Sequence, residues 1–115
     1  MSGGWGWPDE LDAVIAAPRH HVVLLENERV RVLDTRIEPG DLVPLHTHGW
    51  PSVYYVVRWS DFVRRDGDRR VLVDTRLAPK AGRRSALWAE PMPPHTLENV
   101  GAAILHVVSV ELKEP

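Results

Sequence analysis

The chain has 115 residues, which is enough for one domain with a buried core and too few for two. Its 14 basic and 16 acidic residues nearly cancel, so no excess of charge favours nucleic acid or an anionic membrane as a partner. The absence of cysteine excludes disulfides, thiolate metal ligands and a cysteine nucleophile. The first residues lack the pattern of a signal peptide, and no apolar run is long enough to span a bilayer. We therefore expect a soluble cytoplasmic protein without a membrane partner.

The ten prolines and eight glycines predict many short elements joined by turns. Pro8 suits the first position of a short helix that ends near Ala17, so residues 1–19 form an arm and a helix. From residue 20 onward, alternating and β-branched segments predict strands. We expect them at residues 20–25, 29–37, 53–58, 62–65, 69–74, 85–90 and 102–112. This pattern predicts an all-β sandwich or jelly-roll barrel over residues 20–115.

A pair of histidines lies in the segment between the second and third of these strands. In an extended chain His46 and His48 leave the same face with Cα atoms about 6.5–7 Å apart, so both imidazoles can reach one metal ion. Imidazole binds zinc, iron, nickel and copper, and the pair does not choose among them. The same H-x-H spacing would also occur if the two histidines were simply polar residues on a solvated strand face.

A second histidine segment, P-M-P-P-H-T-L-E-N-V-G at residues 91–101, completes a resemblance to the cupin superfamily. Gly40, His46 and His48 match the first cupin motif, G-x5-H-x-H, while His95 and Asn99 match the end of the second. The run L-E-N-E-R-V-R-V further resembles small single-domain bacterial cupins, including one associated with β-alanine degradation. The resemblance implies a cupin jelly-roll β-barrel of six to ten strands, in which His46, His48 and His95 hold a divalent metal ion.

The chain departs from the cupin pattern at the glutamate of the first motif, which would fall at Ser52 or Val53. Three neutral imidazoles leave a divalent ion its full charge, which favours anionic ligands such as carboxylates, enolates or thiolates. Glu98 lies an odd number of residues from His95, so in a regular strand it faces away. An all-histidine triad resembles that of the thiol and β-diketone dioxygenases, which implies Fe(II), with zinc, nickel or manganese as alternatives.

Five residues are candidates for substrate contacts. Arg36 is suited to a substrate carboxylate, although an ion pair with Asp34 explains it equally well. The aromatic candidates are suited to a mostly apolar pocket or to plain core packing. His106 is in phase with Ile104, Val108 and Val110, which predicts that it points inward. The candidates are Arg36, Trp50, Tyr54, Trp88 and His106.

Several other polar residues receive structural interpretations. His20 and His21 are expected at the surface or in a dimer contact. The arginine pair at 64–65 flanks an acidic turn and is interpreted as a solvated hairpin tip rather than a nucleic-acid patch. Asn99 is expected to tie a turn to the backbone. Trp5 and Trp7 offer apolar surface to a second copy, which predicts a homodimer.

Three functions are compatible with these observations. The first is an iron oxygenase that acts on a small organic acid, thiol or diketone. The second is a zinc or nickel enzyme with isomerase, lyase or hydrolase chemistry. The third is a non-catalytic module that binds a small ligand. One fold can host all three functions, so only the residues of the site can distinguish among them.

Overall fold

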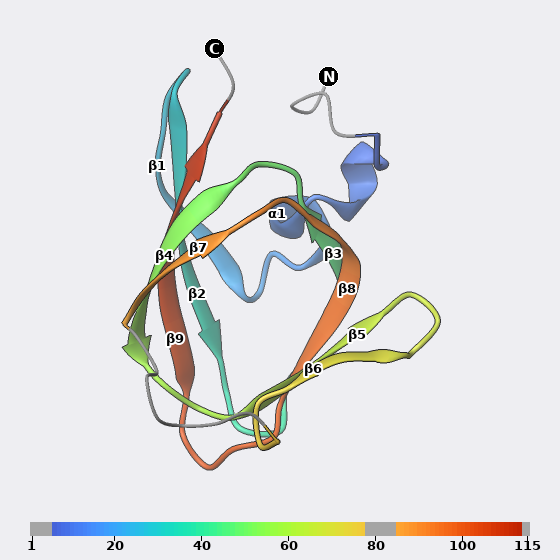
Figure 1. Cartoon of the computed structure of the whole chain (residues 1–115). Coiled ribbons are helices and arrows are strands. Elements are labelled where there is room, and N and C mark those ends of the chain that lie inside the picture. Colours follow the sequence, from blue (N-terminus) through green and yellow to red (C-terminus); the bar gives the residue numbers. More distant parts are fainter. Residues whose placement is uncertain (1–5, 78–84, 114–115) are drawn as a thin grey trace.

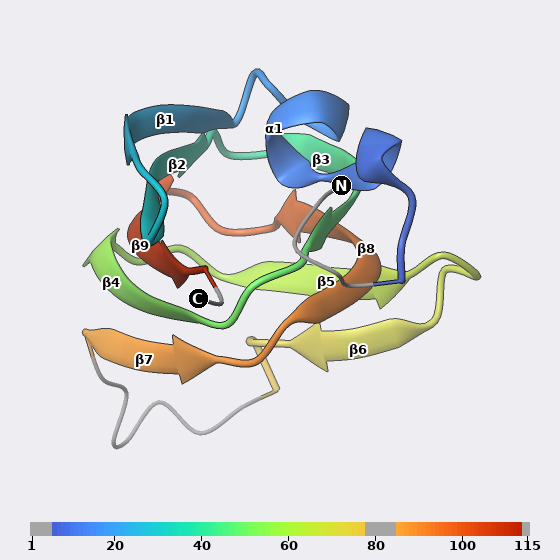
Figure 2. The same ribbon diagram turned by 90° about the horizontal axis from the view of Figure 1, so that it is seen from above.

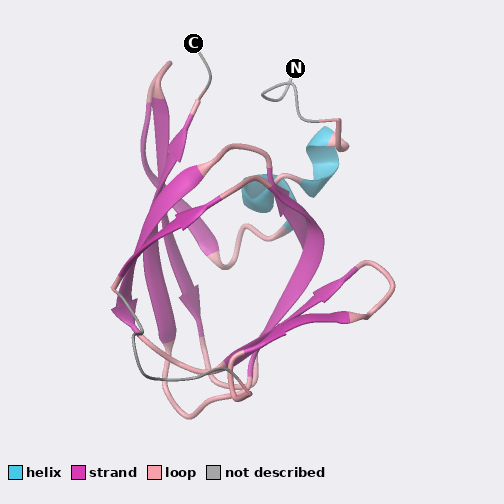
Figure 3. Cartoon of the chain, viewed as in Figure 1, coloured by secondary structure: helices cyan, strands magenta, loops and turns pink. Residues whose placement is uncertain are grey.

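We describe the protein from a computed structural model, in which residues 6–77 and 85–113 are described. Most of this part of the chain is β-structure, which agrees with the all-β jelly-roll prediction (Figures 1 and 3). Within these residues the strands are β1 (His21–Glu26), β2 (Val30–Ile37), β3 (Leu42–His48), β4 (Ser52–Arg58), β5 (Phe62–Asp66), β6 (Val71–Asp74), β7 (Ala86–Ala89), β8 (Met92–Asn99) and β9 (Leu105–Leu112).

The strands form two antiparallel sheets that face each other across the barrel. One sheet has the order β1-β2-β9-β4-β7 and the other the order β3-β8-β5-β6. The chain crosses between the sheets after β2, β3 and β4, so residues distant in sequence face one interior (Figure 1). His46 on β3 is directly opposite His95 on β8 in this pairing, which brings the two histidine segments together.

Strand β8 begins within the proline-rich stretch that precedes His95. Pro93 and Pro94 belong to the strand itself. Between the pairs His46–His95 and His48–Met92, two steps on β3 match three on β8, which is a bulge that holds both prolines. The pairing of β5 with β8 begins only at His95, so no ladder hydrogen bond is required of the prolines on that side.

Gly40 and Asn99 join the two motifs through the backbone. The Gly40 N–H donates to Asn99 O at 3.0 Å, and the Asn99 N–H donates to Asp41 O at 3.0 Å. Gly40 has a φ of +83°, a conformation that glycine adopts without steric cost. The Asn99 side chain donates to Ile37 O and Ala103 O, which confirms that it ties a turn to the backbone.

A short N-terminal segment lies between β1 and β3, which are edge strands of the two sheets. It consists of a 3-10 turn (Asp9–Leu11) and the helix α1 (Ala13–Ala16), which lies over β3 when the barrel is seen from above (Figure 2). A bridge between Asp12 and Thr47 attaches the segment to β3 between the two histidines. No described helix has the length and apolar character needed to cross a membrane.

The inner face of β9 carries Leu105, Val107 and Ser109, which line the interior cavity. The prediction that His106 points inward with Val108 and Val110 is therefore wrong. The cause is that the outer face of this sheet is apolar too, with Val53, Tyr55 and Val57 of β4 exposed. Since both faces of β9 carry apolar residues, periodicity alone cannot identify the inner one.

Candidate metal centre

A cavity of about 190 Å³ lies between the two sheets. Most of its wall is apolar, and its polar groups gather around four histidines, which is typical of a small-molecule site. The residues that line it are His21, Thr35, Ile37, Val43, His46, His48, Ser52, Tyr54, Val56, Trp59, Phe62, Arg64, Leu87, Met92, His95, Leu97, Leu105, Val107 and Ser109.

The three histidines predicted as ligands lie together in this cavity. The ring centroid of His46 is 5.0 Å from that of His48 and 4.3 Å from that of His95. The centroids of His48 and His95 are 5.6 Å apart. Alternation along β3 turns His46 and His48 to the same side, and the pairing of β3 with β8 adds His95.

His21 joins the same cluster, and the expectation that His20 and His21 are surface residues is wrong. Both are almost fully buried in the single chain. The ligand nitrogens of His21, His46 and His48 all lie within 4.8 Å of one another, a spacing at which one metal ion can hold all three. This tight set has His21 where the prediction had His95. The sequence carried no spacing signal for His21, because it stands on β1, far along the chain from either motif.

Each of the four imidazoles has its Nδ1 engaged by the protein. The Nδ1–H groups of His46 and His95 donate to Pro44 O and Pro93 O, each at 2.7 Å. His21 donates from Nδ1 to Ala17 O at 3.0 Å, and His48 Nδ1 faces a Glu111 oxygen at 3.3 Å. Such contacts fix the tautomer and leave Nε2 with its lone pair free, the arrangement usual for metal-binding histidines.

Burial lowers the pKa of three of these imidazoles. Together with the nearby His48, it brings the pKa of His21 to about 4 and that of His95 to about 3, so both rings are uncharged at neutral pH. The pKa of His46 also falls well below its ordinary value, first through burial and then through His48 and His95. Because a metal ion binds neutral imidazole, the donor set is suited to a divalent cation.

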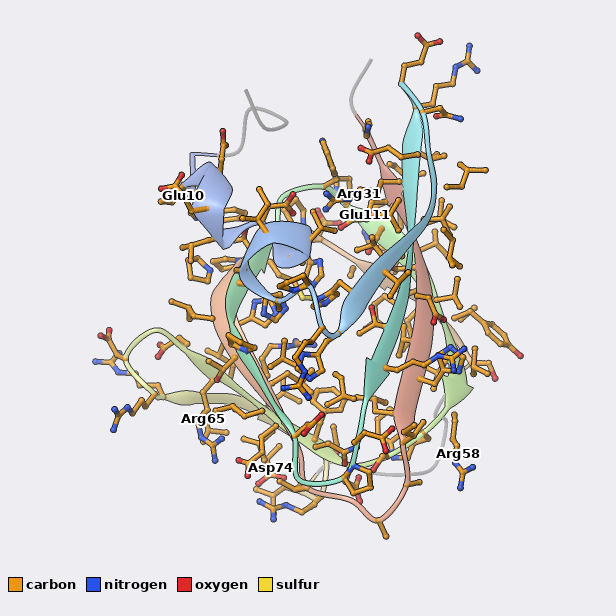
Figure 4. The ribbon with its side chains drawn as sticks, turned by 180° about the vertical axis from the view of Figure 1, so that it is seen from behind. Glu10, Arg31, Arg58, Arg65, Asp74 and Glu111 are labelled. Atoms are coloured by element: carbon orange, nitrogen blue, oxygen red, sulfur yellow. The ribbon has the colours of Figure 1, made fainter. Side chains whose placement is uncertain are left out.

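Glu111 on β9 provides a carboxylate that the first motif lacks. It is 1% exposed and lies opposite Ser52 in the pairing of β4 with β9, beside a predicted position of the missing glutamate. Its carboxylate accepts hydrogen bonds from His48 Nδ1 and from Arg31 Nε, the latter at 2.5 Å. Arg31 in turn donates to both oxygens of Asp12, each at 2.8 Å. Glu111 therefore stands behind His48, next to Arg31 (Figure 4).

Arg31 and Glu111 stabilise each other in their charged forms. Burial alone would raise the pKa of Glu111, but the hydrogen bonds from His48 and Arg31 outweigh it and hold that pKa below its ordinary value. Burial alone would also disfavour the charged form of Arg31 and lower its pKa, but the hydrogen bonds to Asp12 and Glu111 outweigh burial and raise that pKa. The carboxylate behind His48 thus strengthens that imidazole as a donor.

The five predicted substrate contacts are not brought together. Tyr54 lines the cavity, and Trp88 lines a second pocket next to it, which Tyr54 shares. Arg36 is 63% exposed and paired with Asp34, which also accepts a hydrogen bond from His106. Trp50 lies beneath the Arg31 guanidinium, 4.9 Å from its ring centroid.

The position of Arg64 in the cavity differs from the position predicted from the sequence. The prediction placed Arg64 and Arg65 together at a solvated hairpin tip. Because neighbours on a strand face opposite sides, Arg64 lines the cavity while Arg65 points away from the barrel and pairs with Glu98 (Figure 4). A doublet of like charges carries no signal for which member points inward.

Comparison with known proteins identifies the architecture. Neither the protein-family models nor the curated protein sequences searched contain a match. Among solved structures, a cupin domain from Bordetella pertussis Tohama I is similar, with a TM-score of 0.63 and 20% identity over 82% of this chain and 92% of that one. A predicted oxalate decarboxylase from Thermotoga maritima has a TM-score of 0.51 and 22% identity, covering 82% of this chain and 79% of that one. The polyketide cyclase RemF from Streptomyces resistomycificus has a TM-score of 0.52 and 18% identity, covering 82% and 64%. The chain has the cupin fold.

Proposed function

We propose that this protein is a metal-dependent enzyme that acts on a small anionic organic molecule inside the barrel. The observation that carries the proposal is the cluster of four histidines at one wall of an apolar cavity, in which the protein contacts each Nδ1 and, among the described residues, no hydrogen bond engages an Nε2. In a purely structural cluster of buried histidines, both ring nitrogens would be expected to have partners.

His46 and His48 would hold the metal ion together with His21, whose ligand nitrogen belongs to the same tight set. His95, with its ring centroid 4.3 Å from that of His46, would add a fourth nitrogen. A bound divalent ion would supply Lewis acidity, or redox chemistry if it is iron. The chain's own contribution is to keep His21, His46 and His95 neutral, to fix the orientation of the ligands through backbone carbonyls and Glu111, and to surround the reacting atoms with apolar side chains.

The finer activity we propose is oxygenation by Fe(II) of a small organic acid, thiol or diketone. Its support is that no carboxylate of the described residues belongs to the tight histidine cluster, and Glu111 is occupied by Arg31 and His48. The alternative is a zinc or nickel site with isomerase, lyase or hydrolase chemistry. This alternative is supported by two structural neighbours, which are named as a predicted oxalate decarboxylase and a polyketide cyclase.

The test is metal analysis by plasma mass spectrometry on protein purified without oxygen. We expect close to one ion per chain in the wild type and a sharp loss in His48→Ala and His95→Ala. His106→Ala is the matched control, because this histidine faces out of the barrel and should leave the metal content unchanged. Iron followed by oxygen uptake with thiols or diketones supports oxygenation, whereas zinc or nickel supports the alternative. No metal after reconstitution refutes the enzyme proposed, and a ligand-binding cupin then remains.

A further inference from the structure

Arg64 on β5 is a cationic side chain directed into the barrel. Its neighbour Arg65 donates to Glu98 at 3.0 Å on the outside, whereas Arg64 lines the same cavity as the histidines. The guanidinium carbon of Arg64 lies 5.6 Å from the ring centroid of Phe62, also a cavity residue. An aromatic ring orients a guanidinium but does not neutralise it.

Within the described residues, Arg64 has no anionic partner. Its Nε is buried and makes no hydrogen bond there, and no carboxylate forms an ion pair with it. Burial lowers the pKa of this guanidinium, although arginine remains charged at any physiological pH. Arg31, which is more deeply buried than the half-buried Arg64, has two carboxylate partners. A charge withdrawn from water without a partner is costly, so an anionic ligand would stabilise Arg64.

The position of Arg64 suits one end of an elongated ligand. Arg64, Tyr54, Met92 and His95 line both the histidine cavity and the adjoining pocket that contains Trp88. Arg64 thus stands where the two spaces meet.

We propose that Arg64 binds a carboxylate of the molecule that occupies the cavity, and that the ligand of this site is a small organic acid with an apolar body. The planar fork of the guanidinium, with its free Nε–H, matches the two oxygens of a carboxylate. The inference rests on the proposed function only in making this molecule the substrate; the anion site itself does not require the metal.

The test measures binding to chelator-treated, metal-free protein by calorimetry. The probes are isovalerate and benzoate, each compared with its neutral amide, which has the same shape without the charge. We expect the wild type to prefer each acid over its amide. Arg64→Gln should weaken binding of the acids at least about tenfold and leave the amides unchanged. Arg65→Gln is the matched control and should bind the acids as the wild type does.

Two further measurements keep the inference testable if Arg64→Gln does not fold. Arg64→Lys retains the charge but loses the fork, so we expect an intermediate loss of affinity. In the unaltered protein, the NMR resonance of the Arg64 Nε–H should shift when isovalerate is added and should not shift when isovaleramide is added. A folded Arg64→Gln that binds acids within about twofold of wild type, or a wild type that binds acids and amides equally, overturns the inference.

The outcome is separable from that of the metal experiment. Acid binding that depends on Arg64 in a protein that never takes up metal supports this inference while the enzyme proposal fails. Full metal loading with no dependence of acid binding on Arg64 overturns this inference and leaves the metal site standing.

Discussion

Replacing Glu111 with glutamine tests whether the buried carboxylate behind His48 supports a metal site. The carboxylate accepts hydrogen bonds on both oxygens, from His48 Nδ1 and from Arg31 Nε. A glutamine has one acceptor and one donor end, so one of the two contacts must be lost. If the amide NH₂ faces His48, the imidazole shifts its proton to Nε2, which removes the lone pair that a metal ion needs.

The expected magnitudes follow from burial. Glu111 is 1% exposed, and Arg31 keeps only Asp12 as a charged partner after the change. Breaking a buried ion pair costs about 3–5 kcal/mol, and because Arg31 retains one carboxylate we expect the lower end, about 3 kcal/mol of unfolding free energy. Loss of a carboxylate behind a ligating histidine weakens metal binding by about 10–100-fold.

The assay is urea unfolding of the metal-free protein together with metal titration against a competing chelator. Glu98→Gln is the matched control, since Glu98 also pairs with an arginine, Arg65, but on the outer surface. Such an exposed pair is worth about 0–1 kcal/mol, so its loss should change neither stability nor metal affinity measurably. If Glu111→Gln binds metal as tightly as Glu98→Gln, our assignment of Glu111 to the metal site is refuted.

Three further predictions concern protonation, backbone strain and assembly. Metal-free protein should lose stability as the pH falls from about 6.5 toward 4. In this range the histidines of the unfolded chain bind a proton, whereas His21 and His95 in the folded protein stay neutral. The free energy of unfolding should therefore fall by about 1.4 kcal/mol per pH unit for each of these groups. Urea unfolding at several pH values checks it, and a flat profile would contradict it. Gly40→Ala should destabilise by about 1–2 kcal/mol through its φ of +83° alone, since an added Cβ meets nothing within 4 Å. Gly67→Ala, with equal space and no positive φ, should be near neutral in the same thermal melts. Finally, light scattering should give a homodimer for the wild type and a monomer for Tyr55→Glu, because Tyr55 is 53% exposed on the apolar outer face of the larger sheet; an unchanged mass would place any dimer contact elsewhere.

The sequence predicted the fold well because strand and turn chemistry is local. Alternation, β-branched runs and the D-G-D turn each depend on a few neighbouring residues, and the structure has strands at all the expected segments. The pairing of His46 with His95 was accessible only through the resemblance, since it depends on β3 meeting β8 across the sheet. Of the two tryptophans predicted to contact a second copy, Trp5 lies outside the described residues and Trp7 is half-buried.

The interior charges of the barrel were missed for a common physical reason. Sequence periodicity assumes that apolar residues face inward and charged ones outward. Glu111 and Arg64 violate this assumption, because a barrel that encloses a polar site directs charges toward its centre. His21 was missed differently, since its position is set by the N-terminal helix, whose Ala17 carbonyl accepts its Nδ1–H.

The two proposals are linked by the balance of charge inside the barrel. Asp12 and Glu111 each carry one negative charge, while Arg31 and Arg64 each carry one positive charge, so these four buried or cavity-lining groups cancel. Histidines bind metal as neutral groups, and a divalent ion would therefore add two uncompensated positive charges. A ligand with one carboxylate on Arg64 and a second anionic group, such as an enolate, thiolate or carboxylate, at the histidines would balance them. The same arrangement would disfavour a neutral molecule, because it would leave the charge of the metal ion unbalanced and Arg64 without an anionic contact in a low-dielectric interior.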